Sequence, residues 1–267
     1  MEARLRELAE EPGVWSPIDP VGDLIVDDGL WIVVRGRAAT IERIRLAEGR
    51  VGDAVRRVRA MAADNGWNPV LWWAGERATP RDLARRLGDL GLRPDDEVPE
   101  LVSLAIDREP SGASAVEVRR VRDLDAYRRA VDLDMEIWGT PPERRAAIAR
   151  CARERWEAYG GNPAIEHYVA YLDGAPAGFG RAVFTPWAAL LMGGTVRAEA
   201  RGRGVYRALV HARWRDAVSR GTPRLTTAAG EMSSPVLRAM GFREIGRVRL
   251  MRDPRIRTGP PGAALTG

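Results

Sequence analysis

A glycine turn between arginines is the stretch of this sequence best suited to bind a ligand. The run TVRAEARGRGVYRALV, from Thr195 to Val210, places Gly202 and Gly204 after a strand-like apolar segment and before a helix-like one. The unpaired N–H groups and the dipole of a helix N-terminus favour a phosphate. The glycines allow close approach, and Arg201 and Arg203 add positive charge. The pattern predicts an anion site, with an ordinary surface turn as the alternative.

Residue usage excludes several other chemistries. The turn is not a dinucleotide fingerprint, because Arg207 occupies the third glycine position. The sequence contains no lysine, so it has neither a Walker phosphate loop nor a pyridoxal phosphate Schiff base. Cys151 is the single cysteine, so no disulfide forms within the chain. Two histidines and one cysteine, far apart in sequence, argue against a metal site.

Composition predicts a soluble cytoplasmic protein. The net charge of +5 comes from 42 arginines interleaved with 37 acidic residues, which argues against a nucleic-acid partner. No apolar run approaches the roughly 18 residues of a membrane helix, and we expect no membrane partner. The first residues lack the apolar segment of a signal peptide.

The second half of the sequence predicts an α+β domain with a mixed sheet. Residues 115–121 alternate like a strand, and two helical patterns follow, the second opened by Thr140 as cap and Pro141 as first residue. A hairpin is expected to turn at Asp173 and Gly174. A buried strand, the glycine turn, a helix, a strand, a short helix capped by Ser234 and a last strand pair complete the order β-α-α-β-β-β-α-β-α-β.

An internal repeat predicts two copies of one fold. Residues 66–80, GWNPVLWWAGERATP, align without a gap with residues 221–235, GTPRLTTAAGEMSSP. Helix-like segments precede both copies, and a helix with a Gly-apolar step follows both. We therefore expect the domain arrangement to be a degenerate domain at 1–107, a linker at 108–114, an intact domain at 115–255 and a disordered tail at 256–267.

The second half resembles the GCN5-related N-acetyltransferase (GNAT) family. Val196 ends the strand, RGRG at 201–204 matches the family's R-G-x-G turn, and Gly241-Phe242 match its second motif. The resemblance covers about residues 115–253 and implies two GNAT-like domains in tandem, of which the C-terminal one is intact.

The resemblance implies acetyl-coenzyme A as co-substrate and direct acyl transfer to an amine of a small molecule. The coenzyme's pyrophosphate would lie on the backbone amides of the turn, and its pantetheine arm would pair with the strand near Val196. The residues implied in coenzyme binding are Val196, Arg201, Gly202, Arg203, Gly204, Val205 and Tyr206.

The sequence departs from the family at two positions that bear on catalysis. Tyr206 stands where glycine or alanine is usual, and Leu237 stands where a tyrosine commonly protonates the leaving thiolate. Glu231 and His167 are candidate proton acceptors, and Ser233 is a candidate donor to the thiolate. Glu231 also has a structural alternative, since its repeat partner is Glu76.

The sequence leaves other functions open. The same fold could use another acyl donor or perform a different reaction, or it could be a non-catalytic coenzyme-binding or structural protein. The oligomeric state is expected to be a monomer or a homodimer.

Overall fold

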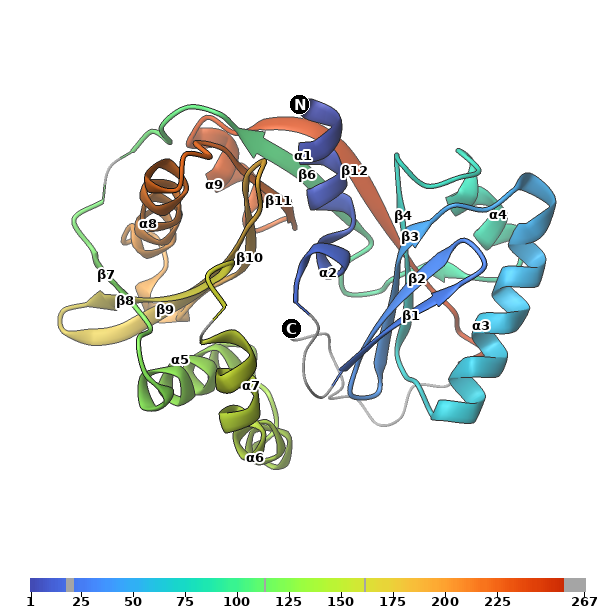
Figure 1. Cartoon of the computed structure of the whole chain (residues 1–267), viewed down its shortest axis with the longest axis horizontal. Helices are drawn as coiled ribbons and strands as arrows, with labels where there is room; N and C mark the ends of the chain where they lie inside the picture. Colours follow the sequence, from blue (N-terminus) through green and yellow to red (C-terminus); the bar gives the residue numbers. More distant parts are fainter. Residues whose placement is uncertain (18–21, 113, 161, 257–267) are drawn as a thin grey trace.

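The computed structural model describes residues 1–17, 22–112, 114–160 and 162–256. In this part of the chain the strands form one mixed sheet of twelve strands that runs through both halves (Figure 1). The elements of the first half are α1 (Glu2–Glu10), α2 (Pro12–Trp15), β1 (Gly22–Asp27), β2 (Leu30–Arg35), β3 (Ala38–Ile44), the 3₁₀ turn η1 (Glu48–Arg50), α3 (Val51–Asn65), β4 (Val70–Gly75), α4 (Leu83–Asp89), β5 (Arg93–Pro94) and β6 (Glu100–Ile106).

The second half follows the predicted order with one additional helix boundary. Its elements are β7 (Glu117–Arg120), α5 (Leu124–Ile137), α6 (Pro142–Arg150), α7 (Ala152–Tyr159), β8 (Ile165–Leu172), β9 (Ala175–Phe184), β10 (Ala189–Val196), the 3₁₀ turn η2 (Ala198–Ala200), α8 (Val205–Ser219), β11 (Leu225–Ala229), α9 (Ser234–Ala239) and β12 (Arg243–Arg252). The predicted second helix is divided into α6 and α7 at Cys151. The mixed α+β class is confirmed.

Local predictions were confirmed at the turns and wrong at two caps. The β8–β9 hairpin turns at Asp173 and Gly174, both at positive φ. Thr140 does not cap α6, because that helix begins at Pro142 with Pro141 as its cap residue. Ser234 is already helical in α9, so Ser233 occupies the cap position, without a side-chain cap hydrogen bond. The predicted last strand pair is a single strand, β12, bent by a bulge.

The internal repeat is visible in the fold. In the first half β3, η1, α3, β4 and α4 follow one another, and in the second half β10, η2, α8, β11 and α9 do the same. Strand β3 is parallel to β4, and β10 is parallel to β11. Each helix crosses between parallel strands, as a βαβ unit requires. The two halves are therefore copies of one unit.

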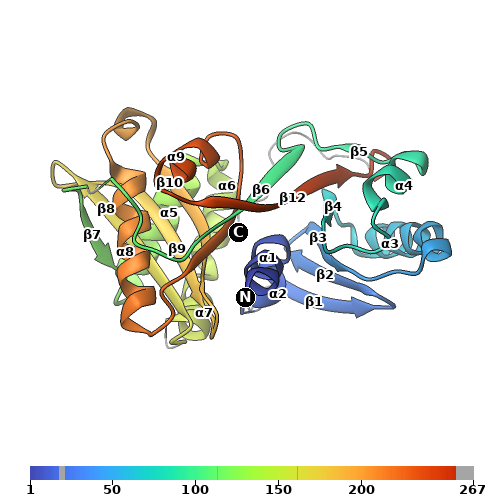
Figure 2. The ribbon, with the colours of Figure 1, turned by 90° about the horizontal axis from the view of Figure 1, so that it is seen from above.

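The last strands of the two halves are exchanged. The sheet order is β1-β2-β3-β4-β12-β6-β11-β10-β9-β8-β7, so β12 pairs with β4 of the first half and β6 pairs with β11 of the second. Strands β6 and β12 also pair with each other and join the halves (Figure 2). Because backbone hydrogen bonds must be satisfied in both halves, neither half has a complete sheet without the other.

Helices cover the second half of the sheet on both faces. Helix α8 packs on one face, and α5–α7 lie on the opposite face (Figure 1). Helix α1 packs beside β6, β11 and β12, where Leu5 and Leu8 are fully buried. Within the described residues, none of the helices combines the length and the apolar character that a membrane crossing requires.

Separate apolar cores hold the halves. Trp67 and Trp72 lie in the core of the first half, beneath α3, while Trp73 belongs to a small cluster at the junction. Ile256, the first residue of the predicted tail, packs against the first core, and residues 257–267 lie outside the described residues.

Candidate functional site

The glycine turn has the conformation of an anion-binding cradle. Gly202 and Gly204 have φ angles of +74° and +83°, which side chains of L-residues rarely adopt, and α8 begins immediately afterwards at Val205. In the described part of the chain, the backbone N–H groups from Gly202 to Arg207 donate no hydrogen bond. These donors lie at the positive end of the helix dipole, so the turn can accept an anion.

The side chains around the turn are exposed and cationic. Arg201 forms no ion pair with a described residue, whereas Arg203 pairs with Asp173 at 2.9 Å. A side chain added at Gly202 would meet nothing within 4 Å, which leaves that side of the turn open to a ligand.

The linker passes beside the same turn. A Cβ added at Gly204 would lie 2.9 Å from Ser114 Oγ, and one added at Gly112 would meet the guanidinium of Arg207. His211 of α8 lies 3.2 Å from the carbonyl oxygen of Gly112. The linker therefore packs along the first turns of α8 and helps to fix the turn, and His211 serves this packing.

Strands β10 and β11 separate next to the turn. Their pairing ends after Ala189 with Leu225 and Leu190 with Thr226, and a bulge follows in β10 between Met192 and Thr195. The buried guanidinium of Arg213 donates to the carbonyl oxygen of Gly193 within this bulge. This contact from α8 holds the bulge in place.

Tyr206 points into the region where the strands separate. A Cβ at Gly194 would lie 2.8 Å from Tyr206 Cε2, so the ring packs directly on a residue that must lack a side chain. The Ser233 side chain lies close enough to the Tyr206 hydroxyl to favour its charged form. Burial raises the pKa of the Tyr206 phenol, so it stays protonated at neutral pH and can donate a proton.

Asp134 approaches β10 from the opposite face of the sheet. Its Oδ1 accepts a hydrogen bond of 2.7 Å from Thr195 Oγ1, one residue beyond Gly194. Burial raises the pKa of the Asp134 carboxyl, and the hydrogen bond from Thr195 and the charge of Arg181 oppose this rise only partly. A carboxylate with a raised pKa is a stronger proton acceptor than an exposed one.

The catalytic residues expected from sequence lie in different environments. Glu231 is an exposed carboxylate in the loop after β11, and Ser233 lies beside Tyr206. His167 is buried among Tyr127, Tyr159 and Phe179, and burial lowers the pKa of its imidazole to about 3. A group with so low a pKa is a weak base, and its surroundings suit a packing role better than proton transfer.

Residues 127–242 match the model of the Acetyltransferase (GNAT) family. This part of the chain is a GNAT domain. The match includes the glycine turn, Tyr206, Asp134 and Ser233, and it confirms the resemblance of the second half. A search of curated protein sequences gives no significant match.

Solved structures share the fold of the whole chain. A GCN5-related N-acetyltransferase from Kribbella flavida superposes with a TM-score of 0.67 at 14% identity and covers 95% of this chain and 96% of its own. A tandem GNAT protein from the clavulanic acid biosynthesis pathway gives 0.62 at 17% identity, covering 94% of each chain. A GCN5-related N-acetyltransferase from Sphaerobacter thermophilus gives 0.57 at 19%, covering 95% of this chain and 93% of its own. The chain therefore has a tandem GNAT fold.

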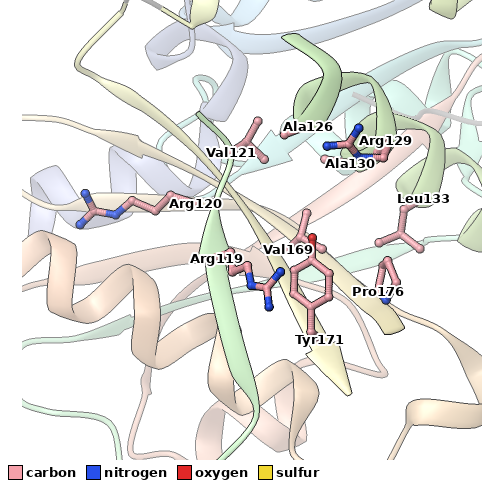
Figure 3. A pocket seen from close by; sticks show the side chains of 10 residues that line it. All are labelled: Arg119, Arg120, Val121, Ala126, Arg129, Ala130, Leu133, Val169, Tyr171 and Pro176. Carbon is pink, nitrogen blue, oxygen red and sulfur yellow. The ribbon is translucent and has the colours of Figure 1, made fainter. Parts of the chain in front are cut away.

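Two cavities in the GNAT domain lie apart from the turn. One, of about 60 Å³, lies between β7 and α5 and is lined by Arg119, Arg129 and Tyr171 among others (Figure 3). It holds no more than a few water molecules. The other, of about 200 Å³, lies at the start of β8 beside Trp156 and His167. In the described residues no group of three His, Cys, Asp or Glu side chains is arranged for a metal.

Sequence reasoning did not select Asp134, Thr195 or Arg181 of the GNAT domain. Asp134 follows Tyr127 and Ala130 at helical spacing, so it lies toward the buried face of α5 and not on its solvent face. A carboxylate on the buried face of a predicted helix is the sequence signal that could have identified Asp134. Thr195 and Arg181 lie in strands whose bulge and pairing the sequence does not reveal.

Proposed function

We propose that the GNAT domain transfers the acetyl group of acetyl-coenzyme A to an amine of a small molecule. The observation that carries the proposal is the glycine turn with unpaired amides from Gly202 to Arg207, placed within the residues that match the family. A pyrophosphate is the anion that such a turn fits, because it accepts several N–H donors at once.

The surroundings of the turn fit the rest of the coenzyme. The edge of β10 beyond Leu190 is not paired with β11, so the pantetheine amides have unpaired backbone groups to bind near Val196. The thioester supplies an activated acyl carbon and a thiolate leaving group. All other functions in the transfer fall to side chains of the protein.

Asp134 is the proposed proton acceptor for the amine. An ammonium ion cannot attack a carbonyl carbon, so the acceptor must lose a proton as its nitrogen forms the new bond. The Asp134 carboxyl has a raised pKa and is held beside β10 by Thr195. Glu231, by contrast, is exposed, and no residue in the described part of the chain orients it.

Tyr206 is the proposed proton donor for the thiolate. Leu237 is fully buried at the position where the family commonly has a tyrosine, so the usual donor is absent. The Tyr206 ring reaches the separated strands from α8, and the Ser233 side chain lies near its hydroxyl. As the carbon–sulfur bond breaks, the phenol proton of Tyr206 passes to sulfur. The phenolate then takes the second proton that the new amide nitrogen loses, and the Asp134 proton returns to water. Under this assignment Ser233, the donor expected from sequence, is a neighbour of the proposed donor.

The test is amine-dependent release of thiol from acetyl-coenzyme A. Purified protein is incubated with the coenzyme and a panel of primary amines, free thiol is followed with a chromogenic disulfide, and the products are identified by mass. Transfer predicts thiol release that requires an amine and that falls in the Asp134→Asn variant. A protein that binds the coenzyme without any amine-dependent release would be a coenzyme-binding protein, and the proposed transfer would be wrong.

A further inference from the structure

The acceptor side of the GNAT domain, meaning the face of the sheet on which Asp134 lies, carries an arginine that no described carboxylate pairs with directly, although the charge of Asp134 acts on it. Arg181 of β9 is cross-strand neighbour to Met192 of β10 and to His167 of β8. Its Nη2 lies 3.7 Å from Met192 Sδ, a weak acceptor, and it forms no ion pair within 4 Å with a described residue. Burying a charged guanidinium away from water costs free energy unless an anion pairs with it.

A second arginine increases this excess of positive charge. Arg35, at the end of β2 in the first half, lies close enough to Arg181 to repel its charge. Burial, and next the charge of Arg35, lower the pKa of the Arg181 guanidinium. Arg35 also lacks a hydrogen bond or ion pair with any described residue, although Glu42 lies near enough to interact with it electrostatically.

The arginines lie beside the proposed proton acceptor. Arg181 and Thr195 face the same side of the sheet, because the bulge in β10 keeps Thr195 in phase with Met192. The charge of Arg181 also acts on Asp134, which is bound to Thr195. Asp134, which attracts an amine, and Arg181, which attracts an anion, therefore lie on one face of the sheet, and the charge of Arg35 acts there as well.

From this juxtaposition we infer that the amine acceptor also carries a carboxylate, as an amino acid does, and that Arg181 binds this carboxylate with help from Arg35. Arginine matches a carboxylate through two parallel N–H···O bonds, which fixes the orientation as well as the charge. The amine is then directed toward Asp134. The inference rests on the proposed function and specifies its substrate class.

The first half gains a role in recognition under this inference. Arg35 comes from the copy that lacks the glycine turn, yet its charge acts on the acceptor side of the other copy. An amine without a carboxylate would leave both guanidinium groups with no directly paired anion, and only the more distant charges of Asp134 and Glu42 would act on them. The substrate carboxylate removes their mutual repulsion, which a carboxamide cannot do.

The experiment compares α-amino acids with their C-terminal carboxamides as acceptors in the thiol-release assay. We expect kcat/KM for the acids to exceed that for the matched amides by at least about tenfold, the usual effect of one charged hydrogen bond. Arg181→Gln should abolish the preference by raising KM for the acids more than for the amides. Arg145→Gln, at an arginine of α6 paired with Asp132, should keep it.

A second variant keeps the test decisive if Arg181→Gln does not fold. Arg35→Gln should also reduce the preference for acids, by less than Arg181→Gln does. Equal rates for acids and amides, with release clearly dependent on the amine, would overturn the inference and leave the proposed function intact. If no amine promotes thiol release, the proposed function fails and this inference fails with it.

Discussion

The two halves of the chain are built on one plan and differ at the start of one helix. In the first half, η1 ends at Arg50 and α3 begins at the next residue, Val51. In the second half, η2 ends at Ala200 and α8 begins at Val205, so the four residues 201–204 are additional. These residues are the glycine turn. A short insertion therefore separates the copy that has the glycine turn from the copy without one.

The two copies also differ in the side chain at one interior position of the sheet. The fully buried indole of Trp72 lies beneath α3 in β4, and its repeat counterpart in β11 is Thr227, whose hydroxyl donates to the carbonyl oxygen of Leu191. A large apolar side chain fills the space in the first half, where the second half keeps a small polar one. The large Trp72 side chain and the absence of a glycine turn both indicate that the first half binds no coenzyme.

The first half nevertheless remains part of the same structure. It supplies β6 to the second half and receives β12 in return, and the charge of its Arg35 acts on Arg181 of the second half. Loss of the ligand site in one copy does not remove its structural role. The comparison predicts that variants in the second half affect coenzyme chemistry, whereas variants in the first half affect stability and acceptor choice.

The largest effect is expected for the proposed proton acceptor. Asp134→Asn should lower kcat/KM about 10²- to 10³-fold, the usual contribution of a positioned base. Since the raised pKa of Asp134 must be passed before it can accept a proton, wild-type activity should rise with pH above the ordinary aspartate value of 3.8, and the variant should lose this limb. Steady-state rates across pH measure both effects.

Two carboxylates serve as controls for this variant. Glu97→Gln changes an exposed carboxylate of the first half, and Glu231→Gln changes the exposed one expected from sequence. Both should retain activity within about twofold. A large loss in Glu231→Gln together with little loss in Asp134→Asn would reverse the assignment.

The next effect concerns stability at the junction of the halves. The Glu10 carboxyl lies between Gly75 of β4 and Gly246 of β12, and its Oε1 has no hydrogen-bond partner among the described residues. Burial raises the pKa of Glu10 to about 7 from 4.5. The folded state thus holds its proton more tightly, and the free energy of unfolding should fall by up to about 3 kcal/mol as pH rises from about 4.5 to about 7.

Urea unfolding at several pH values measures this dependence. Glutamine at position 10 cannot ionise, so Glu10→Gln should not show this decrease in the free energy of unfolding with pH. Glu97→Gln, which changes an exposed carboxylate, should show the same decrease as wild type. The same decline in Glu10→Gln as in wild type would show that another group is responsible.

A smaller effect is expected at the glycine turn. Asparagine tolerates positive φ, so Gly202→Asn adds a side chain on the open side of the turn at little conformational cost. It should weaken acetyl-coenzyme A binding about ten- to thirtyfold, the loss of one charge-assisted hydrogen bond. Gly221→Asn is the matched control, since Gly221 has a φ of +73° and also has no atom within 4 Å. Equal affinities of the two variants for acetyl-coenzyme A would argue against coenzyme binding at the glycine turn.

The smallest effect is expected for the proposed proton donor. Tyr206→Phe keeps the ring that packs on Gly194 and removes only the hydroxyl, so kcat should fall about tenfold with coenzyme affinity unchanged. Tyr171→Phe, on the β8–β9 hairpin, is the control and should be neutral. An unchanged kcat in Tyr206→Phe would mean that the thiolate leaves without this donor.

The sequence predicted the elements of the GNAT domain but not the strand exchange. Glycines, caps and periodicity are local signals, so the Asp173-Gly174 hairpin and the turn before α8 could be predicted. Which strand pairs with β11 depends on long-range packing, and the repeat alone is equally consistent with each half keeping its own last strand. For the same reason Asp134 and Thr195, which are 61 positions apart, could not be paired in advance.

Calorimetric titration of the purified protein with acetyl-coenzyme A tests the central difference between the halves most directly. The account predicts micromolar binding of one coenzyme per chain and no comparable binding of ATP. Deleting residues 201–204, so that α8 follows η2 directly as α3 follows η1, should abolish the heat of coenzyme binding. Circular dichroism and the unfolding midpoint verify that the deletion variant is folded. Two coenzymes per chain, or unchanged binding in a folded deletion variant, would contradict the account.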